Sequence, residues 1–197
     1  LLAAGQQVAG GVALARRLVR EGMKVALVSR QAKNLTVLAQ ELNRLGDPNA
    51  ARIYSCDATD ERSVEAAMKL VRLEMGVPSL VVYSIQRFCP GKSVDTELDA
   101  FEDSWRHNCL GGFVVAREAA RAMKAMGRGS IILIGSTSGV VGRADHLNLA
   151  VGKFGLRAVS HVMSRELWQD GIHVAHVIID ADVAEDEGSA ADYPQSN

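Results

Sequence analysis

The stretch LLAAGQQVAGGVALARRLVREGMKVALVSR, residues 1–30, decides the fold expected for this chain. Its first four residues are apolar and predict the end of a strand. An amphipathic segment at 10–20 predicts a helix that stops at Gly22, and residues 24–29 predict a second strand. A strand, a glycine-rich turn, a helix and another strand in this order predict a parallel β-α-β unit.

Strand-like and helix-like segments continue to alternate after residue 30. Further strands are expected at 52–56, 80–84, 129–135 and 173–179, and helices at 35–45, 63–74, 102–126 and 149–168. Gly111 and Gly112 weaken the helix propensity in the middle of segment 102–126. Alternation of this kind is typical of a parallel sheet covered by helices. We therefore predict an α/β fold, a Rossmann-type doubly wound parallel sheet with helices on both faces.

The length and composition favour a single domain. With 197 residues and 48% hydrophobic content, the chain can bury one sizeable core. We expect this domain to span residues 1–184, with its first strand and its last elements incomplete. The polar, acidic segment 185–197 shows no periodicity and predicts a flexible tail.

Charge and cysteine usage exclude several classes of protein. The 22 Lys and Arg residues nearly balance the 23 Asp and Glu residues without a basic stripe, which disfavours a nucleic-acid partner. The apolar runs are too short to span a bilayer, and we see no export leader, so we expect no membrane partner. Three cysteines without C-x-x-C spacing indicate reduced thiols in a cytoplasmic protein.

The five histidines do not predict a metal site. His173 and His176 lie three residues apart in an expected strand and should point to opposite faces. His107, His146 and His161 have no Cys, Asp or Glu at ligand spacing on a shared face. We therefore expect no metal and regard all five as ordinary core or surface residues.

Two segments near the amino terminus predict a dinucleotide site. The turn AGQQVAGG at residues 4–11 follows a strand and opens a helix, where small residues and helix amides suit a pyrophosphate. Ser29-Arg30 ends the second expected strand where NAD-binding proteins carry an acidic residue. An Arg suits the 2′-phosphate of NADP, with Lys33 adding to the field. A solvated surface Arg remains the alternative.

On these features the chain resembles the short-chain dehydrogenase/reductase family up to about residue 183. Gly5, Ala9 and Gly11 fall on the positions of the family's glycine motif, and Asp57-Ala58 on its adenine-contacting pair. The resemblance implies that a cofactor, NADP(H) rather than NAD(H), is bound by Gly5, Gln7, Ala9, Gly10, Gly11, Ser29, Arg30, Asp57, Ala58, Ser84, Lys153 and Ile179. It also implies catalytic roles for three residues, which are Ser136, Lys153 and Asn108.

The chain departs from the family at the catalytic tyrosine. In the family this Tyr follows the Ser by 13 positions and precedes the Lys by four, and both counts lead to Leu149. The run GIHVAHVIID at 171–180 is similar to an atypical subset of the family that carries Phe or Leu there. The cofactor wall at residues 83–86 and the Ile179-Asp180 pair also depart from the family pattern.

The resemblance implies hydride transfer to or from a small carbonyl or alcohol substrate, with a non-standard proton donor. Candidate donors are Tyr83, His146 and a water held by Asn108 and Ser136. The alternative is a non-catalytic NADP(H)-binding module, a sensor or a partner subunit. The family also implies a homodimer or homotetramer built through the two long helices.

Overall fold

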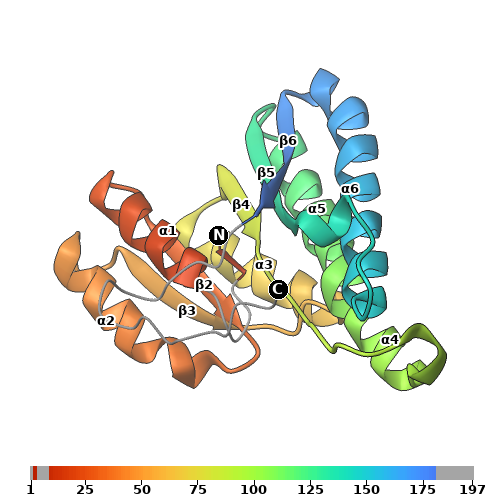
Figure 1. Ribbon diagram of the computed structural model, residues 1–197. Coiled ribbons are helices and arrows are strands. Elements are labelled where there is room, and N and C mark those ends of the chain that lie inside the picture. Colours follow the sequence, from red (N-terminus) through yellow and green to blue (C-terminus); the bar gives the residue numbers. More distant parts are fainter. Residues whose placement is uncertain (1, 4–8, 181–197) are drawn as a thin grey trace.

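Six parallel strands form one sheet in the described part of the chain (Figure 1). The computed structural model describes residues 2–3 and 9–180. The strands are β1 (Leu2–Ala3), β2 (Val25–Ser29), β3 (Ala51–Ser55), β4 (Leu80–Tyr83), β5 (Gly129–Ser136) and β6 (Ile172–Ile179). Their order across the sheet is β3-β2-β1-β4-β5-β6. The sheet grows from β1 first in one direction and then in the other, which is the predicted doubly wound arrangement.

Helices cover both faces of this sheet (Figure 1). They are α1 (Ala9–Arg20), α2 (Thr36–Leu45), α3 (Glu61–Met75), α4 (Leu98–Trp105), α5 (Gly111–Lys124) and α6 (Leu147–Leu167). One apolar core joins α1 and α2 to β2, and a larger one joins α3, α5 and α6 to β4, β5 and β6. Within the described ranges, no helix combines the length and apolarity that a membrane crossing requires.

Helix α1 stops just before Gly22, as predicted. Gly22 has φ +79°, a left-handed conformation that glycine adopts without steric cost. Its amide donates to the carbonyl of Val19, and the next amide, of Met23, donates to Leu18. These bonds close the helix and turn the chain back into β2. The four residues Val25–Val28 are all buried, as expected for a central parallel strand.

The long helix predicted at 102–126 differs from the structure. It begins earlier, at Leu98, and a π-helical turn at Arg106–Leu110 separates α4 from α5. Directly after this turn the helix runs very close to the sheet: a Cβ added to Gly111 would lie 2.5 Å from the Tyr83 hydroxyl. The weakness predicted at Gly111 and Gly112 is displaced in the structure: both glycines are helical at the start of α5, and the irregular turn lies directly before them.

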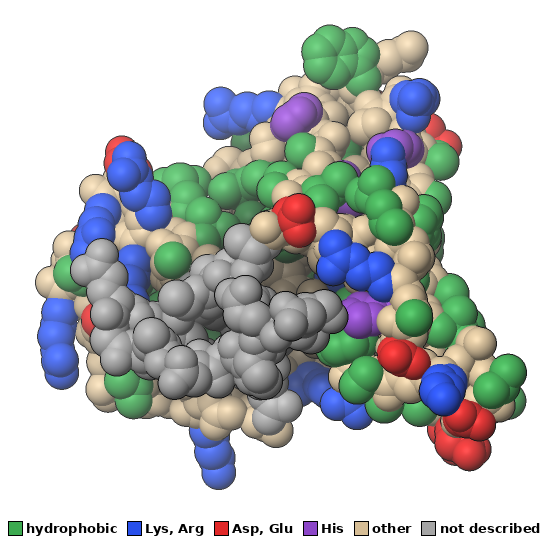
Figure 2. Space-filling view, in the orientation of Figure 1, with side chains coloured by type: hydrophobic (Ala, Val, Ile, Leu, Met, Phe, Trp, Pro, Cys, Tyr) green, Lys and Arg blue, Asp and Glu red, His purple; other side chains and the backbone are tan. Residues whose placement is uncertain are grey.

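The two faces of strands β5 and β6 are buried to different extents. Ile131 and Leu133 are fully buried toward α5 and α6, whereas Ile132 and Ile134, on the other face, are half-buried. Val177 of β6 is 40% exposed. Figure 2 shows a band of hydrophobic side chains across the middle of the molecule, over β4, β5 and β6. This band continues the core that α1 and α2 share with β2.

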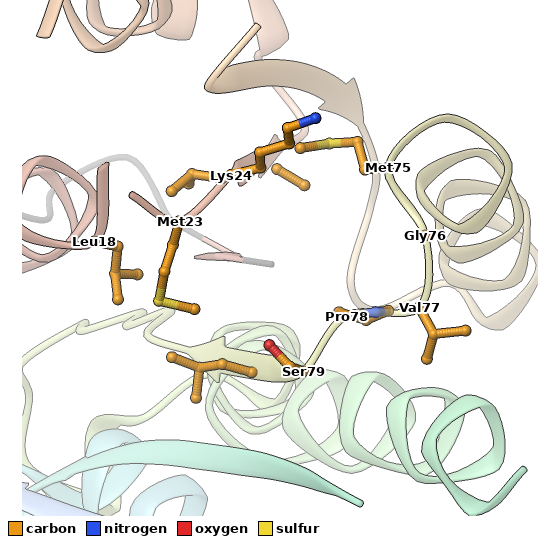
Figure 3. A pocket seen from close by; sticks show the side chains of 11 residues that line it. Leu18, Met23, Lys24, Met75, Gly76, Val77, Pro78 and Ser79 are labelled. Atoms are coloured by element: carbon orange, nitrogen blue, oxygen red, sulfur yellow. The ribbon is translucent and has the colours of Figure 1, made fainter. Parts of the chain in front are cut away.

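A cavity of roughly 270 Å³ lies at the amino-terminal edge of the sheet, between the starts of β2 and β4 (Figure 3). It is lined by Leu18, Met23, Lys24, Val25, Ala26, Met75, Gly76, Val77, Pro78, Ser79 and Leu80. The described part of β1 pairs only with Leu27–Val28 and Val82–Tyr83, so no described strand fills the gap before them. Ligands of doubly wound sheets bind at the opposite, carboxyl edge. The cavity is therefore a gap in strand pairing and not the candidate active site.

Candidate active site

Ser136 ends β5 at the carboxyl edge of the sheet, beside its β6 partner Ile179. Its hydroxyl oxygen is buried, and no hydrogen-bond partner reaches it among the described residues. Burying a polar atom without a partner costs about 1–3 kcal/mol. Such an atom calls for a partner beyond the described residues, and a substrate oxygen or a water would satisfy it.

Lys153 of α6 is buried at the same edge, with 1% of its surface exposed. Its ammonium donates to the carbonyl oxygens of Ile85, at 3.2 Å, and Ile134, at 3.0 Å. These carbonyls follow Tyr83 and Leu133, the last pair of the β4–β5 ladder. The ammonium thus bridges the two strands where they separate. Burial lowers the pKa of Lys153 to about 8.

Leu149 lies one helical turn before Lys153 on α6 and is 5% exposed. Residues four apart share one face of a helix, so both side chains face the same surroundings. The Leu149 side chain brings hydrocarbon and no hydroxyl to this place. Position 149 therefore supplies no proton donor or acceptor on this face of α6.

Asn108 lies in the π turn and is fully buried. Its side-chain oxygen accepts from the Arg87 amide at 3.1 Å, and its Nδ2 donates to the carbonyls of Arg87, at 2.6 Å, and Ser104, at 2.9 Å. Gly152 of α6 packs against it, since an added Cβ would lie 2.4 Å from the Asn108 Cβ. The amide thus ties the loop after β4 to the helices. Both Nδ2 hydrogens are engaged, and the water expected at Asn108 stays a prediction.

Tyr83 is fully buried at the end of β4, and its hydroxyl donates to the His107 carbonyl at 2.5 Å. Its ring packs beneath Gly111 and Gly112 of α5. Burial raises the pKa of Tyr83 well above its usual range. The Tyr83 hydroxyl proton is therefore held in a hydrogen bond to the backbone and strongly retained, which does not support this residue as the proton donor.

His107 is a polar residue at this edge whose importance the sequence did not indicate. It is 7% exposed, and its Nδ1 lies 2.8 Å from the Asp103 carbonyl, while its Nε2 is buried and has no partner among the described residues. It precedes Gly111 by one turn, and Gly111 faces the Ala58 carbonyl on the loop after β3. The only available signal was adjacency to Asn108, which says nothing about burial.

His176 of β6 is a second histidine with a buried, unpartnered Nε2. It packs against Gly135, where an added Cβ would lie 2.3 Å from that nitrogen. Desolvation, followed by the charges of Lys153 and Arg157, lowers the pKa of His176 below its ordinary value. His173 is exposed, so the two histidines point to opposite faces as predicted.

His146 lies at the rim of the site, directly before α6. Its ring contacts Phe88, with centroids 4.8 Å apart, and its Nδ1 lies 2.7 Å from the Ala144 carbonyl. The loop after β4 and the loop before α6 are joined here, because the Gly91 amide donates to the Asp145 carbonyl. His146 therefore helps to hold the rim together.

A second group of predicted residues lies at the carboxyl ends of β2 and β3. Arg30 is exposed, and Ser29 accepts through its hydroxyl from the Gln31 amide. The Asp57 carboxylate accepts from both the amide and the hydroxyl of Thr59, at 2.9 and 2.7 Å. Partial burial opposes ionisation of Asp57, but the Thr59 bonds and the Arg30 charge lower its pKa overall. The Arg30 charge thus stabilises the ionised form of Asp57.

Part of the predicted glycine turn lies outside the described residues. This applies to Gly5 and Gln7, whereas Ala9, Gly10 and Gly11 open α1 directly after β1. Ser84 and Ile179, also predicted to face the cofactor, are half-buried at the ends of β4 and β6. The carboxyl edge therefore brings together two groups, one around Arg30 and Asp57 and one around Ser136 and Lys153.

These two groups fit a dinucleotide that spans the edge between them. A helix amino terminus follows β1, the strand from which the sheet order reverses. An exposed guanidinium stands at one end and a buried serine hydroxyl without a partner at the other. A guanidinium binds phosphate groups, and a hydroxyl can stabilise the negative charge that develops on a carbonyl oxygen.

Comparison with known proteins gives a consistent result. A family model described as short chain dehydrogenase matches residues 4–185. D-threitol dehydrogenase of Mycolicibacterium smegmatis is 29% identical, over 83% of this chain and 62% of the relative. Sorbitol-6-phosphate 2-dehydrogenase of Escherichia coli is 33% identical, over 86% of this chain and 66% of the relative. The chain thus spans less than two thirds of the length of these relatives.

Solved structures are similar in the same way. A short-chain dehydrogenase from Rhodopseudomonas palustris has a TM-score of 0.84 and 30% identity, over 90% of this chain and 82% of that one. An actinorhodin polyketide ketoreductase with NADPH has a TM-score of 0.80 and 26% identity, over 85% and 64%. An NAD+-bound xylitol dehydrogenase has a TM-score of 0.86 over 91% and 68%, and at 23% identity it supports the fold alone.

Proposed function

The chain belongs to the short-chain dehydrogenase family, and on that premise we propose that it is an NAD(P)-dependent oxidoreductase acting on a small carbonyl or alcohol. The observation that carries the proposal is the buried Ser136 hydroxyl without a partner, at the edge where Lys153 is also buried. A purely structural serine at this position would be bonded within the fold. We propose that this one receives a substrate oxygen.

The chain's own residues would hold the two reactants. When bound, the nicotinamide cofactor supplies the hydride. The Ser136 hydroxyl would donate to the substrate oxygen and so stabilise the charge that develops on it. The Lys153 ammonium would hold the nicotinamide end, while the π turn around Asn108 keeps the loop after β4 in place.

We further propose a preference for NADP(H) over NAD(H). Arg30 is exposed directly after β2, where its guanidinium can bind a 2′-phosphate through charge-assisted hydrogen bonds. His107, whose charge would act on Asp57, also has a buried Nε2 without a partner among the described residues, and the adenosine portion would give that nitrogen one.

Leu149 makes this a slow reductase in our proposal. The family's proton donor is a tyrosine hydroxyl, and loss of a positioned acid costs on the order of 10²–10⁴ in rate. Carbonyl reduction would therefore rely on another donor. The closed fold around Leu149, which is 5% exposed, leaves the binding site itself intact.

The test is Leu149→Tyr, with Leu149→Phe as the matched control that adds the ring without the hydroxyl. We expect the Tyr variant to reduce carbonyl substrates at least tenfold faster than wild type, and the Phe variant to gain nothing. Calorimetric titration with NADPH accompanies the assays on a panel of aldehydes and ketones. NADPH binding without turnover in any variant would instead favour the non-catalytic module, and absence of NADPH binding would contradict both.

We propose that the protein forms a homodimer or homotetramer through α5 and α6. Val151, Phe154 and Val162 lie along one side of α6 and are 37–53% exposed, and Phe113 of α5 is 37% exposed. Apolar side chains on neighbouring helices form a surface that a second copy can cover. A monomeric mass in light scattering at micromolar concentration would contradict this.

We also propose that the protein works in the cytoplasm. All three cysteines carry free thiols, with Cys56 and Cys109 buried and Cys89 exposed. Thiols persist in reducing compartments. Fluorescence microscopy of a tagged full-length protein would test this.

A further inference from the structure

Among the described residues, acceptors reach two hydrogens of the Lys153 ammonium and leave one. The Ile85 and Ile134 carbonyls accept one hydrogen bond each. An ammonium carries three N–H donors. The third has no acceptor that these two strands supply, so it can be offered to a bound molecule.

The Lys153 ammonium is bonded to the strand that carries the hydroxyl proposed to hold the substrate, β5. It is bonded to Ile134, which precedes Ser136 by two residues on β5. Two residues of a strand span about 7 Å. A substrate oxygen at Ser136 together with one water could bridge a backbone spacing of this size to the Lys153 ammonium.

The structure disfavours the other donors within the described residues. The Tyr83 hydroxyl is committed to the His107 carbonyl, and the Nδ2 hydrogens of Asn108 are committed to Arg87 and Ser104. His146 sits at the rim, against Phe88, where solvent reaches it. Leu149 has nothing to donate. Beside the histidines His107 and His176, Lys153 is the buried ionisable group of the site that carries several donors on one nitrogen.

From this placement we infer that Lys153 itself gives the proton to the substrate oxygen, directly or through one water, in place of a tyrosine. The inference rests on the proposed oxidoreductase function. The nicotinamide cofactor, when bound, would supply hydride to the carbonyl carbon, and the C=O π electrons would move to the oxygen. The oxygen takes a proton from the ammonium, which leaves a neutral amine. The amine then regains a proton from solvent.

The electrostatics of the site agree with this role. Because burial lowers the pKa of Lys153 to about 8, the ammonium predominates at pH 7 and is still acidic enough to transfer a proton. His176 approaches from β6, and Arg157 and His161 follow on α6. Desolvation and these cations lower the pKa of His176, so His176 is neutral in the range where Lys153 titrates.

The test substitutes Lys153→Arg in the full-length protein. Arg keeps the positive charge and the donors but does not release a proton near neutral pH. We expect NADPH affinity to change less than about threefold and kcat to fall on the order of 10²-fold or more. Wild-type kcat should fall as pH rises above about 8, since the amine form accumulates there. Lys69→Arg on α3, an exposed change of the same kind, should alter nothing.

Two further measurements distinguish the loss of a proton donor from misfolding of the Lys153→Arg variant. The double variant Leu149→Tyr, Lys153→Arg should recover turnover, since the tyrosine hydroxyl supplies an acid again. In wild type, the rate at which Lys153 is acylated, followed by mass spectrometry across pH, should show a midpoint near 8 without any assay of activity.

The outcomes separate the inference from the function on which it rests. Wild-type turnover retained in Lys153→Arg, or an acylation midpoint near the ordinary value of about 10.4, would overturn the inference alone. Wild type that binds no NADPH and turns over no substrate would overturn the proposed function, and the inference with it.

Discussion

The two ends of the carboxyl edge are built differently. Around Arg30 and Asp57, the side-chain hydrogen bonds join near neighbours, such as Asp57 and Thr59, two residues apart. Around Lys153 they join distant segments: Lys153 and Ile85 are 68 residues apart in sequence. The first end can change with little effect on the fold. The second end is part of the fold, so a substitution there alters stability as well as chemistry.

The largest loss of stability is expected from Asn108→Ala, at the end of the carboxyl edge that is part of the fold. The substitution leaves the part-buried Arg87 amide and two carbonyls without their partner, which costs about 2–4 kcal/mol of unfolding free energy. Urea unfolding measures it. Asn34→Ala is the matched control, because the Asn34 amide bonds only the exposed Gln31 side chain nearby. A loss below about 1 kcal/mol would show that the Asn108 side-chain hydrogen bonds do not stabilise the fold.

A smaller effect is expected from Gly152→Ala. The new Cβ would lie 2.4 Å from the Cβ of Asn108, so α6 and the π turn must move apart. We expect a loss of about 1–3 kcal/mol of unfolding free energy. Gly142→Ala, where nothing lies within 4 Å, serves as the control in the same unfolding series. Equal stability of the two variants would mean that this contact is loose.

The smallest effect on stability is expected from Arg30→Gln. The side chain is exposed, so unfolding free energy should change by less than about 0.5 kcal/mol. NADPH affinity should fall about tenfold, equivalent to about 1.4 kcal/mol, while NADH affinity stays the same. Calorimetric titration with both cofactors measures this. An equal loss for both would contradict a role in binding the 2′-phosphate.

Much of the fold was predictable because its signals are local. Gly22 was expected to end α1, and it does so with φ +79°. The strand and helix order predicted a doubly wound sheet, which the structure confirms. The π turn at Arg106–Leu110 was not predicted, since it follows from the close approach of α5 to Tyr83.

The candidate site was predictable only in part. Spacing from Ser136 to Lys153 located Leu149, because both counts run along a single chain. The residues expected at Gly5 and Gln7 and the tail at 185–197 lie outside the described residues. His107 was treated as ordinary, and its burial with an unpartnered Nε2 could not be read from spacing.

The sequence by itself determined the alternation of strands and helices, the family, and the absence of a hydroxyl at position 149. These depend on residue type and on distance along the chain. Only the tertiary structure decided that the Asn108 amide is engaged, that the Tyr83 proton is committed, and that Lys153 keeps one free donor. Hydrogen-bond partners 19–68 residues apart meet only when the sheet is assembled, and burial in that assembly is what shifts their pKa values.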